Sequence, residues 1–412
     1  MVVRPMFDKL IVTIVTLLTV VHLGMAQTAM PKTIITSVNG KATYPVVLHA
    51  NSHDSLIVSF DLLEPDMRYI RASITPLTLD LKPSRMTEIE FLQSFNRADV
   101  SNIENSQSTV TTYTHYQFIL SNENLLPTIS GNYRLDFVDD DQMSDTILSL
   151  PFYVSESNAT FFPSLSSATD QSFNQGQRQL SLQCNIDKSI NDLNSDNISL
   201  AVFIDGQPVS SNIHPTRLDG NQVIFEHQPE LIFNNGNIWR RFDITDSYYP
   251  GHGISIIQQT PDGNHRFLIE KDIPRVDSQY QTDGTLHGSF IIDSHIGIPE
   301  TNADYCDVVF TLDIPFMPTT PVAIRGEFTR YLPGGVLPMT FDSISNKYKA
   351  ISNLKQGVYN YQYLVGNSLK PDSIEGNFNE TPLRYDLLLY YTSPTVRYPR
   401  IIGHHSFIYN GN

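Results

Sequence analysis

Short stretches of alternating apolar and polar residues constrain the fold of this chain more than any other feature. Residues 133–139 alternate apolar and polar side chains with a period of two, apart from Val138 and Asp139, as a strand does when one of its faces is buried. Helical periodicity is nearly absent after the first 26 residues. Asn-Gly and Asp-Gly dipeptides, which favour tight turns, separate the strand-like runs at residues 39–40, 205–206, 219–220, 262–263 and 283–284. This pattern predicts an all-β fold made of β-sandwiches.

A Gly-X-Tyr step opens two of the alternating runs, with its tyrosine at Tyr133 and at Tyr359. In the tyrosine corner of immunoglobulin-like sandwiches, such a tyrosine hydroxyl donates a hydrogen bond to a nearby backbone carbonyl. We therefore expect tandem immunoglobulin-like domains, and we assign both tyrosines a structural role.

Two breaks in composition divide the chain. Residues 155–179 are rich in Ser, Asn, Gln and Thr, which is typical of a domain entry or a long connection. Residues 315–321 are rich in proline, which indicates a stiff linker. The sequence therefore predicts domains at 27–155, 156–314 and 315–412, and each of them falls in the usual size range.

The first 26 residues have the pattern of a secretory signal peptide. Arg4 and Lys9 precede an apolar run at residues 10–23, and Gly24 and Ala26 supply the small residues of a cleavage site. We expect cleavage after Ala26. The alternative is an uncleaved membrane anchor, although the run is shorter than the ~20 residues that a spanning helix needs.

The charge of the chain argues against nucleic acid as a partner. The formal net charge is −16, from 43 acidic and 27 basic residues, and no long basic run is present. A nucleic-acid-binding protein needs a basic face that neutralises phosphates. An acidic surface instead favours solubility and basic partners.

The two cysteines, Cys184 and Cys306, form an even pair in a chain that we expect to be exported. Such a pair predicts a disulfide in an oxidising compartment. The alternative is two buried free thiols. Neither cysteine has a second Cys or His at the spacing of metal ligands, so we expect no metal and no cofactor.

Motifs of catalysis are missing from the sequence. It contains no Gly-X-Ser-X-Gly elbow, no phosphate-binding glycine loop and no His-Glu-X-X-His pair. We therefore predict that the chain is not an enzyme and takes no small-molecule substrate. A hydrolase whose active-site residues are dispersed along the sequence stays open as an alternative.

Trp239 is the only tryptophan, and the pair Arg240 and Arg241 follows it. Trp and Arg are typical of hot spots in protein–protein interfaces. The alternative is that Trp239 fills the core of the middle domain while an arginine packs over a ring.

Seven segments spread over most of the mature chain carry a likeness to a known family. They are residues 113–116, 130–133, 214–218, 231–242, 303–310, 354–363 and 374–381. On these segments the sequence resembles the plug proteins of the Bacteroidetes type IX secretion system.

This resemblance implies a function in protein secretion. It implies a protein of the periplasm, at the inner side of the outer membrane, that closes the translocon barrel when cargo is absent. The barrel would be its partner, reached through protein contacts. Together with the Trp-Arg argument, the resemblance nominates a set of protein-interface residues, namely Tyr113, His115, Tyr116, Asn237, Trp239, Arg240 and Arg241.

The expected C-terminal domain carries a second likeness. Residues 322–331 and 356–363 are similar to glycogen-binding early-set domains, an immunoglobulin-like fold. Tyr331 stands where the sugar-binding motif usually has Trp. The resulting alternative function is a carbohydrate-binding protein of the cell envelope.

Overall fold

Short strands make up most of the structure, which is a computed structural model of the chain. It describes residues 30–50, 52–121, 124–140, 146–295, 297–317, 319–368, 370–393 and 398–411. The expected signal peptide, residues 1–26, lies outside the described residues. The α-helices are single turns, at α1 (Glu88–Phe91), α2 (Pro299–Asn302) and α3 (Asp372–Glu375). The prediction of an all-β fold is confirmed.

Three large hydrophobic cores organise the described residues, and we call the strands around each core a unit. The core of the first unit draws its buried side chains from residues 34–154. One of its sheets has the order β2-β1-β4-β8-β7, and β6-β5-β9-β10 with β3 forms the opposite layer. Its strands are β1 (Lys32–Val38), β2 (Lys41–Ala42), β3 (Val47–His49), β4 (Leu56–Leu62), β5 (Ile70–Leu77), β6 (Ala98–Asp99), β7 (Asn102–Asn105), β8 (Thr114–Leu120), β9 (Gly131–Asp139) and β10 (Thr146–Ser155).

The second unit is discontinuous in sequence. Its core combines residues 161–233 with residues 383–402. The returning strand β28 pairs with β13 over seven residues, from Ile198↔Tyr391 to Ile204↔Tyr385. Its elements are β11 (Ala159–Ser166), β12 (Gln177–Ile186), η1 (Ser195–Asn197), β13 (Ile198–Ile204), β14 (Gln207–Ile213), β15 (Arg217–Asp219), β16 (Gln222–Phe225), η2 (Pro229–Leu231), β17 (Ile232–Asn234), β28 (Leu383–Tyr391) and β29 (Arg400–Tyr409).

The third unit lies between the two parts of the second unit in sequence, and its core draws on residues 242–374. Its sheets have the orders β18-β27-β23-β24, with β21 also on β27, and β19-β20-β22-β26-β25. Its elements are β18 (Arg240–Asp243), β19 (Ile254–Gln259), β20 (His265–Ile269), β21 (Phe290–Ile292), β22 (Tyr305–Leu312), β23 (Val322–Arg325), η3 (Glu327–Thr329), η4 (Pro333–Gly335), β24 (Leu337–Pro338), β25 (Thr340–Asp342), β26 (Lys347–Lys355) and β27 (Gly357–Val365).

These cores correct the expected domain boundary between residues 314 and 315. Ile314 and Val322 are buried in the same core, and β22 pairs with β26 across the proline-rich segment. The expected C-terminal domain is instead shared between two cores, because its last two strands return to the second unit. The expected boundary between residues 155 and 156 falls just after the last strand of the first unit.

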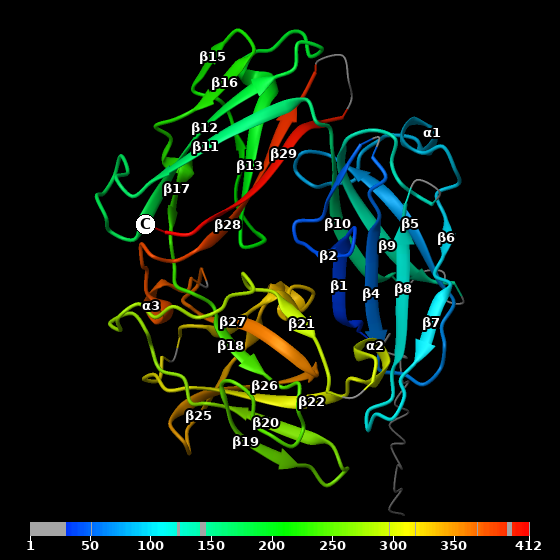
Figure 1. Ribbon diagram of the computed structural model, residues 1–412, viewed down its shortest axis with the longest axis vertical. Helices are drawn as coiled ribbons and strands as arrows, with labels where there is room; N and C mark the ends of the chain where they lie inside the picture. The colour runs from blue at the N-terminus through cyan, green and yellow to red at the C-terminus, as the bar shows by residue number, and fades with distance from the viewer. Residues whose placement is uncertain are drawn as a thin grey trace, which may run out of the picture.

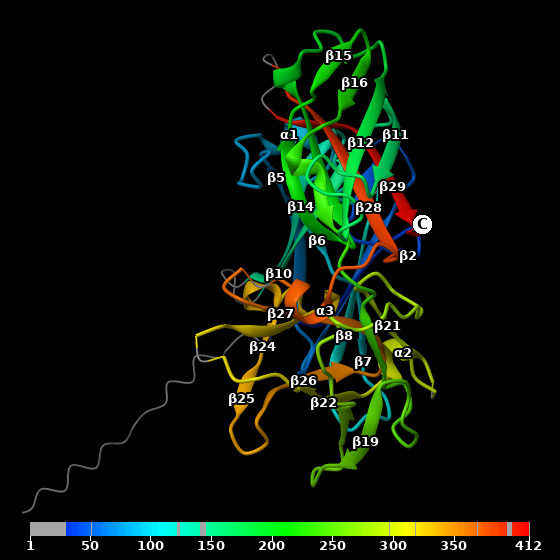
Figure 2. The ribbon, with the colours of Figure 1, turned by 90° about the vertical axis from the view of Figure 1, so that its left-hand side faces the viewer.

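The three units pack side by side. Figure 1 shows the second unit above the third, with the first unit beside both. A single sheet runs from the second unit into the first, because β29 pairs with β10 in parallel at Ser155↔Ile401. A smaller apolar cluster that includes Tyr153, Phe203 and Leu388 packs against this sheet. Figure 2, turned by 90°, shows the second and third units again one above the other.

The predictions for both tyrosines and for the turns at residues 39–40 and 205–206 are met, whereas residues 283–284 close no hairpin. Tyr133 donates from its hydroxyl to the carbonyl of Ile129 at 2.9 Å, and Tyr359 donates to that of Lys355 at 2.5 Å. Both are tyrosine corners with the same four-residue step. Asn39-Gly40 and Asp205-Gly206 close the hairpins β1–β2 and β13–β14 with positive φ at both positions, as the turn type requires.

Candidate functional site

The aromatic residues predicted for an interface at residues 113–116 lie inside the protein. Tyr113, His115 and Tyr116 are all buried. At its N-terminal end β8 is covered on both faces, by the core of the first unit on one side and by the third unit on the other. Tyr116 accepts from the backbone N–H of Arg68, and Tyr113 donates to the carbonyl of Ala303 at 2.8 Å. The prediction that these residues contact a second protein is corrected, because their partners belong to the chain itself.

A buried charge cluster joins the first unit to the third. We call Asp61, His115, Tyr305 and Lys355 the Asp61 cluster. One carboxylate oxygen of Asp61 accepts from Lys355 Nζ at 2.7 Å and from the Tyr305 hydroxyl at 2.8 Å, and the other lies 2.6 Å from His115 Nδ1. The side chains of Asp61 and Lys355 are each only 1% exposed.

The surroundings of this cluster keep Lys355 partnered on several sides. Its ammonium group also donates to the carbonyl of Glu300 at 2.7 Å and lies 4.2 Å from the ring centre of Tyr113. Burial lowers the pKa of Lys355, and the charge of Asp61 opposes that change. Burial and the same charge raise the pKa of Tyr305 well above its ordinary value, so this hydroxyl stays a donor. The cluster fits a structural lock, because Lys355, Tyr305 and His115 Nδ1 surround the Asp61 carboxylate, and His115 Nε2 is the cluster's one buried nitrogen without a partner among the described residues.

A second cluster joins the second unit to the third. We call Asp205, Trp239, His287 and Arg384 the Asp205 cluster. Asp205 sits in the β13–β14 turn and accepts from the Trp239 indole at 2.8 Å and from the Arg384 backbone N–H at 2.9 Å. His287 Nδ1 lies 2.9 Å from the same carboxylate. Trp239 is 7% exposed and donates within the chain, so the interface prediction is corrected; it lies at the junction of the second and third units rather than in a domain core, as the alternative had it.

The residues around Trp239 also bind within the chain. Arg240 forms ion pairs with Asp272 and, at 3.1 Å, with the fully buried Glu375, which Arg275 also pairs at 2.7 Å. Asn237 donates from its side chain to the Glu375 backbone carbonyl. These contacts lie within the third unit and extend it to α3.

Arg241 differs from its neighbours because it is partly exposed. It faces Asp283 at 3.4 Å, beside His252, which lies 3.5 Å from the same carboxylate. Of the predicted interface set, Arg241 is the residue with the weakest internal contact. Its role in an interface stays a prediction.

The predicted disulfide does not form. Cys184 and Cys306 are both buried and free. They lie in different cores, Cys184 in the second unit and Cys306 in the third. Burial raises the pKa of both thiols, which keeps them protonated and unreactive. The alternative of two buried thiols holds.

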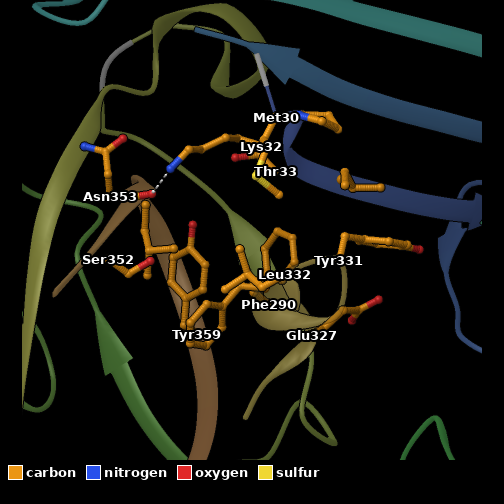
Figure 3. A pocket seen from close by; sticks show the side chains of 14 residues that line it. Met30, Lys32, Thr33, Phe290, Glu327, Tyr331, Leu332, Ser352, Asn353 and Tyr359 are labelled. Atoms are coloured by element: carbon orange, nitrogen blue, oxygen red, sulfur yellow. Dashed lines mark hydrogen bonds between the residues drawn. The ribbon is translucent and has the colours of Figure 1, made fainter. Parts of the chain in front are cut away.

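Several hollows border the third unit, and two of them differ clearly in size. Figure 3 shows the first, between β1 and the third unit, where Lys32 donates to the Asn353 carbonyl beside the rings of Tyr331 and Tyr359. Its volume is about 140 Å³. The second lies between the second and third units beside Trp239 and has a volume of about 570 Å³. Small-molecule and peptide side-chain pockets usually measure several hundred Å³, a size that the second hollow reaches and the first does not.

In the part of the chain that the structure describes, no three His, Cys, Asp or Glu side chains come together as a metal site would require. In the same residues, no helix has the length and apolar character needed to cross a membrane.

Comparison with known proteins decides the family of the first unit. Residues 32–156 match the family model described as Type 9 secretion system plug protein 1st domain. The first unit belongs to this plug family. The resemblance is thereby confirmed over this unit, and the match supports a role in type IX secretion. The plug family is a secretion-system family rather than an enzyme family.

The fold of nearly the whole chain has a solved relative. A crystal structure of a hypothetical protein from Parabacteroides merdae ATCC 43184 is similar with a TM-score of 0.88 and 26% sequence identity, over 92% of this chain and 97% of that chain. A cryo-EM structure of E. coli alpha-2-macroglobulin covers 94% of this chain and 22% of that chain, but its TM-score of 0.18 at 7% identity supports no argument. No curated protein matches the chain.

The part of the chain that matches the plug family also carries exposed apolar side chains. Ile89 in α1 and Phe95 just after it are each 90% exposed. Asn96 donates to Glu88 at 3.3 Å, so the residues that directly follow Phe95 and precede Ile89 in the chain are in contact. Exposed apolar side chains that lie together mark candidate interaction sites. The sequence argument missed them, because it searched for Trp and Arg rather than for apolar residues on a surface turn.

The sugar-binding alternative depended on Tyr331 as an exposed platform. Tyr331 instead packs against the core of the first unit, and burial raises the pKa of its hydroxyl. Its neighbour Arg330 stacks on the ring of Tyr44 with 3.3 Å between the guanidinium carbon and the ring centre. Tyr331 therefore helps to join the first and third units rather than standing as an exposed platform.

Proposed function

We propose that this chain is a periplasmic, non-catalytic plug that closes the outer-membrane translocon barrel of the type IX secretion system when cargo is absent. The observation that carries the proposal is the match of residues 32–156 to the plug family. The signal-peptide pattern of residues 1–26 supports export to the periplasm.

The way in which the units are joined supports a plugging function. A wide open barrel would leak water and solutes, so its stopper must keep its shape against the opening. The Asp61 cluster ties the third unit to the first, and the Asp205 cluster ties it to the second. Both clusters are buried, and breaking such contacts leaves uncompensated charge away from water. The three units therefore behave as one rigid body rather than as independently moving domains.

We place the docking face on the first unit, around Ile89 and Phe95. The family match covers this unit alone, and these two side chains are its most exposed large apolar residues. α1 lies at one end of the first unit, away from the third unit (Figure 1). Arg97, with its side chain 58% exposed, adds a charged group at the edge of the patch. An apolar centre with a polar rim is the usual anatomy of a reversible interface.

An affinity purification from solubilised outer membranes tests the proposal. The tagged wild-type chain should retain the translocon barrel protein. The Ile89→Glu/Phe95→Glu double variant should lose at least about tenfold of the recovered barrel, since each apolar anchor in an interface contributes more than ~1 kcal/mol. Ile344→Glu is the matched control, because Ile344 is 96% exposed in the third unit.

Two results would count against this function. If the wild-type chain retains no barrel protein, the plugging proposal fails. If the barrel is retained equally by the double variant and by the control, the docking face has been misplaced on the molecule.

A further inference from the structure

The larger hollow of the molecule, between the second and third units, contains cationic groups that the proposed plugging function does not use. We call it the Arg325 cleft. Its walls come from the β13–β14 hairpin, from the segment between β17 and Trp239, and from β23, β27 and the start of α3. Its volume is about 570 Å³, which is within the range of pockets that bind small ligands or peptide side chains.

Arg325 is the group in this cleft that most needs a partner. It is partly buried, and among the described residues no carboxylate lies within ion-pair distance of its guanidinium. Its nearest acceptor is neutral: with the amide oxygen of Gln362 turned toward Arg325, that oxygen accepts from Nη2 at 2.6 Å and from Nε at 3.0 Å. Burial and the nearby charge of Arg330 lower the pKa of Arg325 to about 10, and Asp205 offsets only part of this change.

Asp205 cannot serve as the missing partner of Arg325, since its carboxylate is already occupied. It accepts from Trp239 and from the backbone of Arg384, and it also lies beside His287. Buried charges in proteins are normally paired, so an arginine in a cleft without a carboxylate is a binding-site feature. Lys370 lines the same cleft, is exposed, and has no carboxylate partner among the described residues.

The cleft also presents the edges of two sheets. β14 pairs with β13 alone and β17 pairs with β12 alone among the described strands, and both β14 and β17 line the cleft. Edge strands carry backbone donors and acceptors that an extended peptide can satisfy. Apolar side chains such as Val209 and Phe233 lie among these polar groups. This combination suits a peptide that carries an acidic group better than a free inorganic anion.

We propose that the Arg325 cleft binds a carboxylate presented by an extended peptide segment of another protein. Arg325 pairs with the carboxylate, Lys370 adds attraction at the mouth, and the edges of β14 and β17 hold the peptide backbone. The net charge of the chain is −16, so a cationic cleft is a local exception that selects acidic segments. This site lies in the second and third units and does not depend on the docking face around Ile89.

Trp239 gives a direct readout, because it is the only tryptophan and it lines the cleft. The full-length mature protein is titrated with a short acetylated and amidated peptide that has one central aspartate, while the tryptophan emission is followed. The same peptide with asparagine in place of aspartate is the reference. We expect a saturable change in emission with the aspartate peptide, at an affinity at least about tenfold higher than with the asparagine peptide. An asparagine peptide with a free C-terminal carboxylate shows whether a chain terminus can supply the same group.

Variants locate the binding. Arg325→Gln should abolish the preference for aspartate, and Arg325→Lys should keep part of it. Lys370→Gln should reduce the preference by about threefold, as expected for an exposed charge. Because Lys370 is exposed, this variant keeps the test decisive if the Arg325 variants do not fold. Arg217→Gln, an exposed arginine on β15, is the control and should bind like the wild type.

The proposal is overturned if the wild-type protein binds the aspartate and asparagine peptides with equal affinity, or if neither peptide changes the emission. It is also overturned if Arg325→Gln and Lys370→Gln both keep the full preference. Failure to capture the translocon barrel would not affect these titrations, so the two proposals fail separately.

Discussion

The two junctions of the third unit solve the same problem with different chemistry. Toward the first unit, Asp61 and Lys355 form a fully buried ion pair, with Tyr305 and His115 completing the coordination of the carboxylate. Toward the second unit, Asp205 binds Trp239 beside a cleft of about 570 Å³. One junction is closed around a buried pair of opposite charges, whereas the other borders a space with a cation that has no carboxylate partner.

This difference distinguishes a junction that only attaches two units to each other from a junction that can also bind a ligand. A buried ion pair contributes little net stability over apolar packing, but it strongly penalises any arrangement that breaks it. The first junction therefore fixes the position of the plug-family unit on the third. At the second junction, other groups already occupy the carboxylate of Asp205, so Arg325 has no carboxylate partner. We infer that this junction combines attachment with recognition.

The largest expected effect comes from breaking the closed junction. Lys355→Met should lower the free energy of unfolding by about 3–5 kcal/mol, because Asp61 is left buried without its countercharge. Urea unfolding followed by circular dichroism measures the loss. Adding Asp61→Asn should recover part of it, and Lys82→Met, which removes an exposed pair with Asp80, should leave stability unchanged. A loss below about 1 kcal/mol for Lys355→Met would mean that this pair does not hold the units together.

The second junction should be weaker when it is broken. Trp239→Phe removes the donor to Asp205 and should cost about 2–3 kcal/mol, from the lost charge-assisted hydrogen bond and the lost ring volume. The measurement is again urea unfolding by circular dichroism. Tyr249→Phe, at an exposed tyrosine of the same unit, is the control. An unchanged urea midpoint for Trp239→Phe would show that the Asp205 cluster does not stabilise the junction between the second and third units.

The loss of folding stability at acidic pH should depend on Glu375 in the third unit. Burial alone would raise its pKa, but Arg240 and Arg275 outweigh burial and hold the pKa below 4.5. The unfolded chain therefore takes up this proton first, so the stability contributed by Glu375 is present above about pH 4.5 and is lost as the pH falls through the lower folded pKa. Urea midpoints measured across this range should fall more steeply for the wild type than for Glu375→Gln. Equal slopes would show that another carboxylate governs acid unfolding.

A smaller loss of stability, of similar size at both sites, is expected at the tyrosine corners. Tyr133→Phe in the first unit and Tyr359→Phe in the third each remove one hydroxyl hydrogen bond, and each should cost about 1 kcal/mol. Denaturant midpoints of the two variants provide the comparison. If either substitution were neutral, that corner would not contribute to the fold of its unit.

The smallest effect should be that of reductant. Cys184 and Cys306 are free, so titration of the unfolded protein without reductant should find both thiols. Adding dithiothreitol should leave the unfolding midpoint unchanged. If the thiols reacted only after reduction, that result would show that the predicted disulfide is present.

Structural features that depend on only a few neighbouring residues were predictable from the sequence. The Asn39-Gly40 turn and the Gly-X-Tyr steps at Tyr133 and Tyr359 act over two to five positions, and the structure bears them out. The all-β fold followed from alternation, which depends only on the strand period.

Contacts between distant positions were not predictable in the same way. Asp61 and Lys355 are separated by 294 positions, and no local pattern states that they meet. Alternation in β28 indicates a strand but does not say which sheet it joins, so the return of residues 383–409 to the second unit was missed. Tyr113 and His115 were nominated for an interface through the family resemblance of residues 113–116, whereas the third unit covers them within the chain itself.

Cross-linking mass spectrometry in intact cells tests the central claim most directly. The account predicts cross-links between the outer-membrane translocon barrel and the first unit near α1, together with internal cross-links that join all three units in one arrangement. Cross-links to the barrel that avoid the first unit, or internal distances that no single arrangement of the units satisfies, would contradict it.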